Sequence, residues 1–134
     1  MVACNAVILS IKGNEVIVGG LPGNPVSATV CALIYLGPAI RSMLGFSDSV
    51  TPMASAILGC DLAANDERQD YLRSRLALGA NGAMVATPSE TQDSSMFATL
   101  AHADCLVVRA PHAPPAKAGE VVTILPLRGG IVSI

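Results

Sequence analysis

The sequence predicts an α/β fragment, made of a hairpin and a long helix, followed by a small all-β sandwich or barrel. Residues 16–40 carry no charged side chain and run from an apolar strand pattern into an apolar helix pattern. After residue 45 the pattern changes to short runs of strand character separated by turn signals. We therefore expect the fragment over residues 1–45, a linker over 46–52, the β domain over 53–127 and a tail over 128–134.

Two short apolar runs near the N-terminus are predicted to pair as a β-hairpin. Ala6–Ile11 and Val16–Val18 are the runs, and the residues between them at 12–15 are turn formers. Gly19 and Gly20 follow directly. Adjacent glycines at the end of a strand indicate a sharp bend or a close approach of another backbone.

A tight loop then leads into the helix. Pro22-Gly23 is a turn pair, Asn24 is a favoured N-cap, and Pro25 falls at the first helical position, where its missing N–H costs nothing. Ser27 lies in the first turn. Free N–H groups and the positive end of the helix dipole make such a turn an anion site, with the Ser27 hydroxyl as a further donor. The loop is therefore either a rigid ligand wall or a well-capped helix start that binds nothing.

The predicted helix spans Pro25–Leu44 and is apolar almost all round. A helix that is apolar on every side is expected to be buried on every side. Pro38 removes the hydrogen bond to the carbonyl of Ile34, which predicts a kink or break near Gly37.

The β domain is predicted from short segments of strand character. Asp70–Leu78 alternates polar and apolar residues with period two, and Asn81-Gly82 is a hairpin signal. Ser94–Ala103 has a helical pattern. The predicted strands are Met53–Leu62, Asp70–Leu78, Ala83–Thr87, Cys105–Arg109 and Glu120–Leu125.

Charge and hydropathy limit the kinds of partner. The net charge of −2 and the pI of about 5.5 argue against a nucleic-acid binder, which needs a basic surface. Hydrophobic residues make up 51% of the chain and charged residues 13%, so we expect apolar surface that packs on something outside this chain. The prolines within residues 16–40 argue against a membrane span, and residues 1–10 lack the basic start of a signal peptide. We expect a soluble cytoplasmic protein.

The residues that commonly hold metals or react covalently are scattered. The four cysteines are far apart and suggest neither a zinc site nor a disulfide framework, so we expect them to be small buried residues. We interpret the acidic residues between 61 and 70 as a solvated face and predict no metal site. These acids are Asp61, Asp66, Glu67 and Asp70. Arg73 and Arg75 share one face of their strand, either as an exposed polar face or as ligands for a carboxylate or phosphate.

The string Leu21-Pro22-Gly23-Asn24-Pro25-Val26-Ser27, between an apolar strand and an apolar helix, resembles the molybdopterin molybdotransferase family. This family comprises bacterial MoeA and the E domain of eukaryotic gephyrin. Further resemblances follow in the same order along the chain, so that the match covers about residues 12–127. They are the Arg73-Ser74-Arg75 strand, the segment Gln92–Met96 with Leu100–Asp104 after it, and Ala118-Gly119-Glu120-Val121-Val122.

The resemblance implies that residues 1–45 are the end of the family's α/β molybdopterin-binding domain. It implies that Pro22, Gly23, Asn24, Pro25 and Ser27 line the cofactor pocket. The substrates would be adenylylated molybdopterin and molybdate, with AMP released. It also implies magnesium held by acidic residues of upstream segments that this chain does not contain, and a homodimer or further N-terminal domains. We therefore expect the isolated chain to be inactive as a transferase and to hold no catalytic residue of its own.

Two other interpretations stay open from the sequence. The chain is alternatively a non-catalytic interaction module, since in the gephyrin branch the resemblance implies that the C-terminal region helps to hold a receptor peptide. It is alternatively a truncated relic of an ancestral enzyme.

Overall fold

The structure is a computed structural model that describes residues 5–11, 14–47, 51–92 and 97–127. It divides into two compact units, residues 2–51 and residues 52–134, which are described separately below. The predicted tail at 128–134 and the first residues of the predicted helix at Ser94–Ala103 lie outside the described residues.

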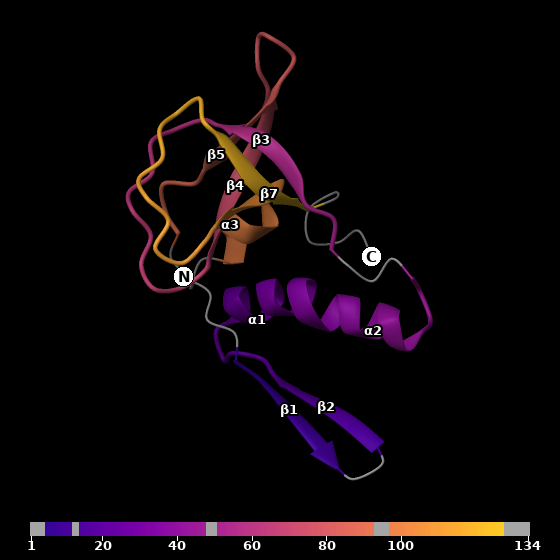
Figure 1. The fold of residues 1–134 in the computed structure, drawn as a ribbon. Coiled ribbons are helices and arrows are strands. Elements are labelled where there is room, and N and C mark those ends of the chain that lie inside the picture. The colour runs from indigo at the N-terminus through magenta and orange to yellow at the C-terminus, as the bar shows by residue number, and fades with distance from the viewer. Residues whose placement is uncertain (1–4, 12–13, 48–50, 93–96, 128–134) are drawn as a thin grey trace. The chain divides into compact units, whose positions relative to one another are not determined.

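The first unit begins with an antiparallel hairpin (Figure 1). Strand β1 (Asn5–Ile11) pairs with β2 (Asn14–Gly20), with Asn5 opposite Gly20 and Ile11 opposite Asn14. The second strand is longer at both ends than the apolar run that predicts it. Gly19 and Gly20 continue its pairing up to the loop that precedes the helix.

A continuous helical run follows, as α1 (Pro25–Cys31), η1 (Ala32–Leu36) and α2 (Gly37–Met43). The middle segment is π-helical, and the N–H of Gly37 donates to the carbonyl of Ala32, five residues earlier. Pro38 has no N–H for the carbonyl of Ile34, and its ring would crowd that carbonyl in a regular α-helix. A wider turn relieves this conflict. The irregularity predicted near Gly37 is therefore a π-helical segment, and the helix does not break there.

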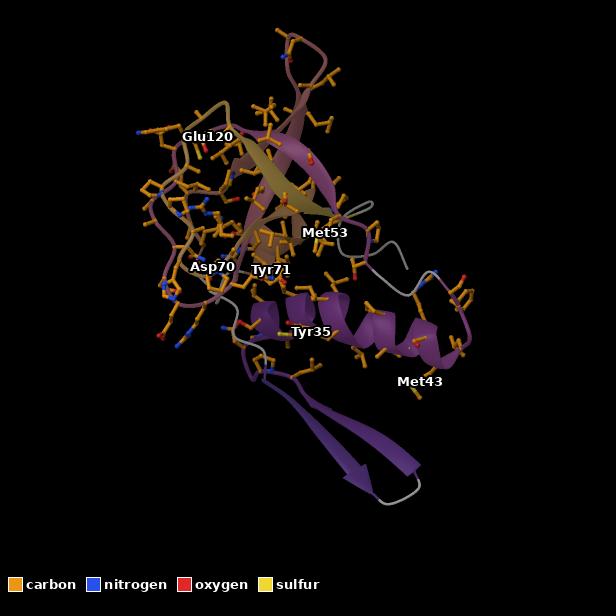
Figure 2. The ribbon with its side chains drawn as sticks, in the orientation of Figure 1. Tyr35, Met43, Met53, Asp70, Tyr71 and Glu120 are labelled. Atoms are coloured by element: carbon orange, nitrogen blue, oxygen red, sulfur yellow. The ribbon has the colours of Figure 1, made fainter. Side chains whose placement is uncertain are left out.

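The two halves of this helix differ in burial. Val26, Val30 and Cys31 are buried, whereas the second half exposes large apolar side chains. Tyr35 is 52% exposed and Met43 is 82% exposed, and both project from the helix in Figure 2. The prediction of a helix buried on every side is therefore wrong for this chain as it stands. By length and composition Pro25–Met43 also resembles a membrane span, a test that core helices of soluble proteins pass as well.

The second unit is a closed five-stranded barrel, so that of the two predicted β architectures the barrel is confirmed. Its strands follow one another around the barrel in the order β3, β5, β4, β6, β7. The β3–β5 pair is parallel and the other pairs are antiparallel. The elements are β3 (Ala54–Leu58), β4 (Asp70–Leu78), β5 (Met84–Pro88), α3 (Phe97–Ala101), β6 (Cys105–Arg109) and β7 (Val121–Pro126).

The first barrel strand ends at Leu58, four residues before the predicted end. Gly59 follows, and a Cβ on Gly59 would lie 2.2 Å from the hydroxyl of Thr87. Only glycine therefore lets the chain leave β3 so close to β5. The N–H of Gly59 still donates to the carbonyl of Ala86 at 2.8 Å, which ties this exit to the neighbouring strand.

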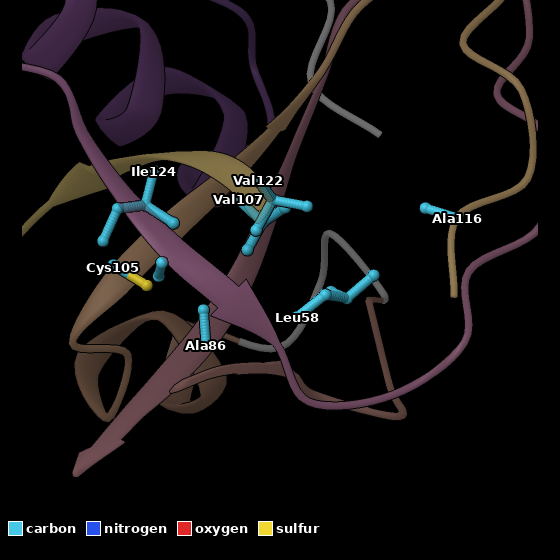
Figure 3. Packing of buried hydrophobic residues seen from close by; sticks show 8 residues of the cluster. Leu58, Ala86, Cys105, Val107, Ala116, Val122 and Ile124 are labelled. Carbon is cyan, nitrogen blue, oxygen red and sulfur yellow. The ribbon is translucent and has the colours of Figure 1, made fainter. Parts of the chain in front are cut away.

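The barrel interior is filled by alternate residues of the strands, as period two requires (Figure 3). Leu58 is 1% exposed, and Ala86, Cys105 and Val107 are fully buried. Ala116 joins them from the loop before β7. The core cluster consists of Ala56, Leu58, Ala86, Cys105, Val107, Ala116, Val122 and Ile124.

Two long loops are joined beside the barrel by hydrogen bonds to backbone carbonyls. The Asn65 amide donates to the carbonyls of Arg68 at 2.7 Å and Ala110 at 2.8 Å. The guanidinium of Arg109 is buried and donates to the carbonyls of Ala63 and Pro114. These bonds satisfy carbonyls that a loop would otherwise leave without partners.

The cysteines are only partly as expected. Cys105 is buried in the barrel core, and Cys60 is a free, partly exposed thiol. Cys31 is disulfide-bonded, which the spacing of the cysteines does not predict. Burial raises the pKa of the Cys105 thiol to about 12, so it stays protonated and inert at ordinary pH.

In the folded chain at mildly alkaline pH, iodoacetamide is expected to modify Cys60 and to leave Cys105 unmodified. The reason is that only the thiolate reacts and Cys105 is both inaccessible and protonated. Mass spectrometry of the digested protein measures the modification at each site. The control is the same reaction in concentrated urea, in which both thiols are expected to react. Equal modification of the two in the folded chain would contradict the burial of Cys105.

Candidate functional site

The loop before α1 is organised by the side chain of Asn24. Its backbone is extended, with φ −77° and ψ 126°, and its Oδ1 accepts hydrogen bonds from the N–H of Val26 at 3.0 Å and of Ser27 at 3.2 Å. The carbonyl of Asn24 accepts from the N–H of Ala28 at 2.8 Å. Pro25 occupies the first helical position, as predicted. Asn24 is therefore a full N-cap.

This capping changes what the turn offers to an anion. Free N–H groups are expected here from the sequence, but those of Val26 and Ser27 already donate to Asn24, and Pro25 has none. That part of the expectation is wrong for the helix start as it is built. A ligand at this loop would meet side chains and the Gly23 backbone, or would have to displace the Asn24 cap.

The predicted site residues differ in exposure. Gly23 and Pro25 are exposed, Pro22 and Asn24 are half-buried, and Ser27 is buried with 5% of its surface exposed. No atom lies within 4 Å of the position that a Cβ on Gly23 would take. The structure thus keeps these residues together in the loop and the first turn of α1, with open space over Gly23 and with Ser27 buried.

The acidic residues between 61 and 70 have separate roles. Lys117, which donates to Asp61 at 2.8 Å, holds the pKa of that carboxyl below its ordinary value. Asp66 accepts from the N–H of Arg68 at 2.8 Å. Burial raises the pKa of Asp70, whose Oδ1 is buried without a hydrogen-bond partner. Across the part of the chain that the structure describes, no three His, Cys, Asp or Glu side chains gather as a metal would require.

The two arginines of β4 do not share an environment. Arg73 is 3% exposed, and Gln92 Oε1 accepts from its N–H at 3.0 Å and from its Nε at 3.2 Å. The Gln92 amide donates in return to the carbonyls of Arg73 at 3.0 Å and Ser89 at 2.8 Å. Arg75 is exposed and pairs with Asp104 at 3.1 Å. The interpretation of both arginines as one exposed polar face is therefore wrong for Arg73.

Gln92 has a role in this region that the sequence does not predict. In the sequence it belongs only to a segment that resembles the family. Its partner Arg73 lies 19 residues away, so no local spacing connects the two. Alternation along β4 places Arg73 and Arg75 on one face but does not say what covers each of them.

Comparison with known proteins identifies the second unit. A family model described as "MoeA C-terminal region (domain IV)" matches residues 55–127, which is more than half of the chain and includes the whole barrel apart from Ala54.

Curated proteins match over a longer stretch. The chain is 33% identical over 110 residues to molybdopterin molybdenumtransferase 1 of Mycobacterium tuberculosis, covering 78% of this chain and 25% of the relative. It is 32% identical over 120 residues to the molybdenum cofactor synthesis protein cinnamon of Drosophila melanogaster, covering 85% of this chain and 20% of the relative. The chain thus spans about a quarter or less of the length of these relatives.

Solved structures show the same fold. A molybdopterin biosynthesis MoeA protein from Pyrococcus horikoshii superposes with a TM-score of 0.64 at 23% identity, over 90% of this chain and 28% of that one. A molybdenum cofactor biosynthesis protein from Pyrococcus furiosus gives a TM-score of 0.60 at 18% identity, over 76% of this chain and 35% of that one. With a family match over the barrel and the same fold in solved relatives, the chain belongs to the MoeA family through its C-terminal region.

Proposed function

We propose that this chain is part of an enzyme that inserts molybdate into adenylylated molybdopterin and releases AMP. The observation that carries the proposal is the family match over residues 55–127. The names of the Mycobacterium and Drosophila relatives, which refer to molybdopterin and to molybdenum cofactor synthesis, support it.

The first unit fits this proposal as the end of the α/β molybdopterin-binding domain. The match to the Drosophila relative covers 85% of the chain, which is more than the barrel alone. Residues 46–52 would then link this domain to the barrel. The exposed apolar side chains of α2 would pack on parts of a longer protein or on a second subunit, in agreement with a homodimer. A cytoplasmic location belongs to the same proposal.

Within the proposed function, the loop is one wall of the pterin pocket. Pro22 and Pro25 restrict its backbone, Asn24 fixes the start of the helix, and the open space over Gly23 lets a flat ring approach the backbone closely. Ser27 would support this wall from its buried position. Magnesium does not fit the described residues, since these gather no set of carboxylates, and its ligands would belong to other parts of a longer protein. The chain alone would therefore bind and not react.

The substitution Gly23→Ala is expected to weaken the binding of molybdopterin by about tenfold or more, which corresponds to about 1.4 kcal/mol, and to leave the stability unchanged. The added methyl group enters the space proposed for the ligand, whereas it meets no atom of the chain itself. Isothermal titration of the chain with molybdopterin measures the binding, and thermal unfolding measures the stability.

The control for this experiment is Ser42→Ala, at an exposed helical position outside the loop, which is expected to bind as the unsubstituted chain does. Equal binding by the Gly23→Ala chain and the unsubstituted chain would show that this loop does not line the pterin pocket. A lack of binding by the unsubstituted chain would favour the non-catalytic interaction module. Molybdate insertion by the purified chain would contradict the proposal that the residues needed for the reaction lie in other parts of a longer protein.

A further inference from the structure

Strand β4 has a neighbour on both sides only at Ser74. Its first half, Asp70–Ser74, pairs with β6, and its second half, Ser74–Leu78, pairs with β5. Beyond Ser74, the edge of β4 on the β6 side therefore has no partner strand among the described residues. In Figure 1 this second half lies in the hairpin of β4 and β5 that extends beyond the other barrel strands.

The backbone hydrogen bonds show which residues point toward this open edge. The carbonyl of Ser74 accepts from the N–H of Asp104, on the β6 side, at 2.9 Å. The N–H of Gly79 donates to Ala83, on the β5 side of the hairpin, at 2.8 Å. Successive residues of a strand direct these groups to opposite sides. The N–H groups of Leu76 and Leu78 therefore face the open edge.

Asp104 occupies the first of these two positions. Its Oδ2 accepts from the N–H of Leu76 at 2.9 Å and from Nε of Arg75 at 3.1 Å. The next position along the edge, Leu78, is 72% exposed. No charged residue occurs in the sequence from 76 to 89. An uncharged, exposed strand edge is a template for pairing with another chain, and a charged side chain placed on it prevents such pairing.

We propose that the Asp104 carboxylate guards this edge of β4 against pairing with the same edge of a second copy of the chain. A strand added here must take the N–H of Leu76, so it must first displace the carboxylate. The displaced carboxylate would then lie against the new strand without its hydrogen bond from the N–H of Leu76, which disfavours the pairing. The proposal concerns only the barrel and does not depend on the proposed function.

The substitution Asp104→Ala is expected to strengthen self-association of the full chain by about tenfold or more, which corresponds to about 1.4 kcal/mol. Sedimentation velocity over a series of concentrations measures the association relative to the unsubstituted chain. The matched control is Arg75→Ala, which removes the ion pair but keeps the carboxylate on the Leu76 N–H. The control is expected to associate as the unsubstituted chain does.

A second substitution tests whether the association uses the open edge of β4. Proline at position 78 removes an N–H that faces the open edge and no hydrogen bond to β5, so it blocks an added strand. The double variant Asp104→Ala with Leu78→Pro is expected to return to the association of the unsubstituted chain. The proposal is overturned if the folded Asp104→Ala chain associates no more strongly than the unsubstituted one. It is also overturned if the double variant associates as strongly as the single one.

Hydrogen exchange tests the open edge without any substitution. In the dilute unsubstituted chain, the amide of Leu76 is expected to be protected by Asp104, and the amide of Leu78 is expected to exchange much faster. Equal protection of the two amides would mean that the edge is already covered, and would overturn the proposal even if Asp104→Ala does not fold.

Discussion

Replacing Leu58 with alanine is expected to lower the free energy of unfolding by about 3 kcal/mol, within the range of about 2–5 kcal/mol for buried leucines. Leu58 is 1% exposed and is, with Ile124, one of the two largest side chains of the barrel cluster, so its truncation leaves a cavity that the closed strands cannot fill by moving inward. Urea unfolding followed by far-UV circular dichroism measures the change. The effect lies in the part of the chain that the family model matches.

The matched control is Leu78→Ala, because Leu78 is the same residue type in the same barrel but is 72% exposed. Its effect is expected to stay within about 0.5 kcal/mol, as for surface substitutions in general. A loss at Leu58 no larger than the loss at Leu78 would show that the barrel interior is not the core of this unit.

Replacing Gln92 with alanine is expected to cost about 3 kcal/mol. The Gln92 amide makes hydrogen bonds to the N–H, Nε and carbonyl of Arg73 and to the carbonyl of Ser89. Without them, the N–H and Nε of Arg73, a residue that is 3% exposed, lose the Gln92 acceptor, whereas the Arg73 carbonyl keeps the N–H of Ser89 at 2.9 Å. Each hydrogen-bonding group that loses its partner and stays buried costs about 1–3 kcal/mol. The expected total is smaller than the sum of these separate costs, because we expect solvent to reach part of the space that the Gln92 side chain leaves. Urea unfolding measures this change as well.

Gln69→Ala is the control for Gln92, since Gln69 is exposed and is expected to change the stability by no more than about 0.5 kcal/mol. A small effect at both glutamines would mean that Arg73 does not need Gln92 to stay buried. Gln92→Glu separates the two halves of the amide. It keeps an acceptor for the Arg73 N–H and Nε but removes the donor to the carbonyls of Arg73 and Ser89. An intermediate loss is therefore expected.

Gln92 and Asp104 form hydrogen bonds with backbone groups on opposite edges of β4. Gln92 replaces a strand on the β5 side at Arg73, and Asp104 occupies the β6 side at Leu76. Each stands where one of the neighbouring strands has ended. β4 can therefore pair with β6 along its first half and with β5 along its second half, while its backbone groups at these two positions stay hydrogen-bonded.

Local signals in the sequence determined the position of the elements and of the candidate loop. Asn24 before Pro25 predicts the start of the helix at Pro25, where it begins, and period two predicts β4 over Asp70–Leu78, the bounds it has. These features depend on residues within a few positions of each other. For the same reason the sequence places the five loop residues together, and their role as a ligand wall stays a prediction.

Only the tertiary structure decided which polar groups are hydrogen-bonded to residues that are distant in the sequence. Arg73 is buried and hydrogen-bonded to Gln92, 19 residues away, and the amide of Leu76 donates to Asp104, 28 residues away. The parallel pairing of Ile57 with Val85 joins β3 to β5 in the closed barrel. The period of a sequence pattern predicts which residues share a face of a strand, but the tertiary fold decides which residues contact that face. That contact depends on residues far apart in sequence, which no local pattern encodes.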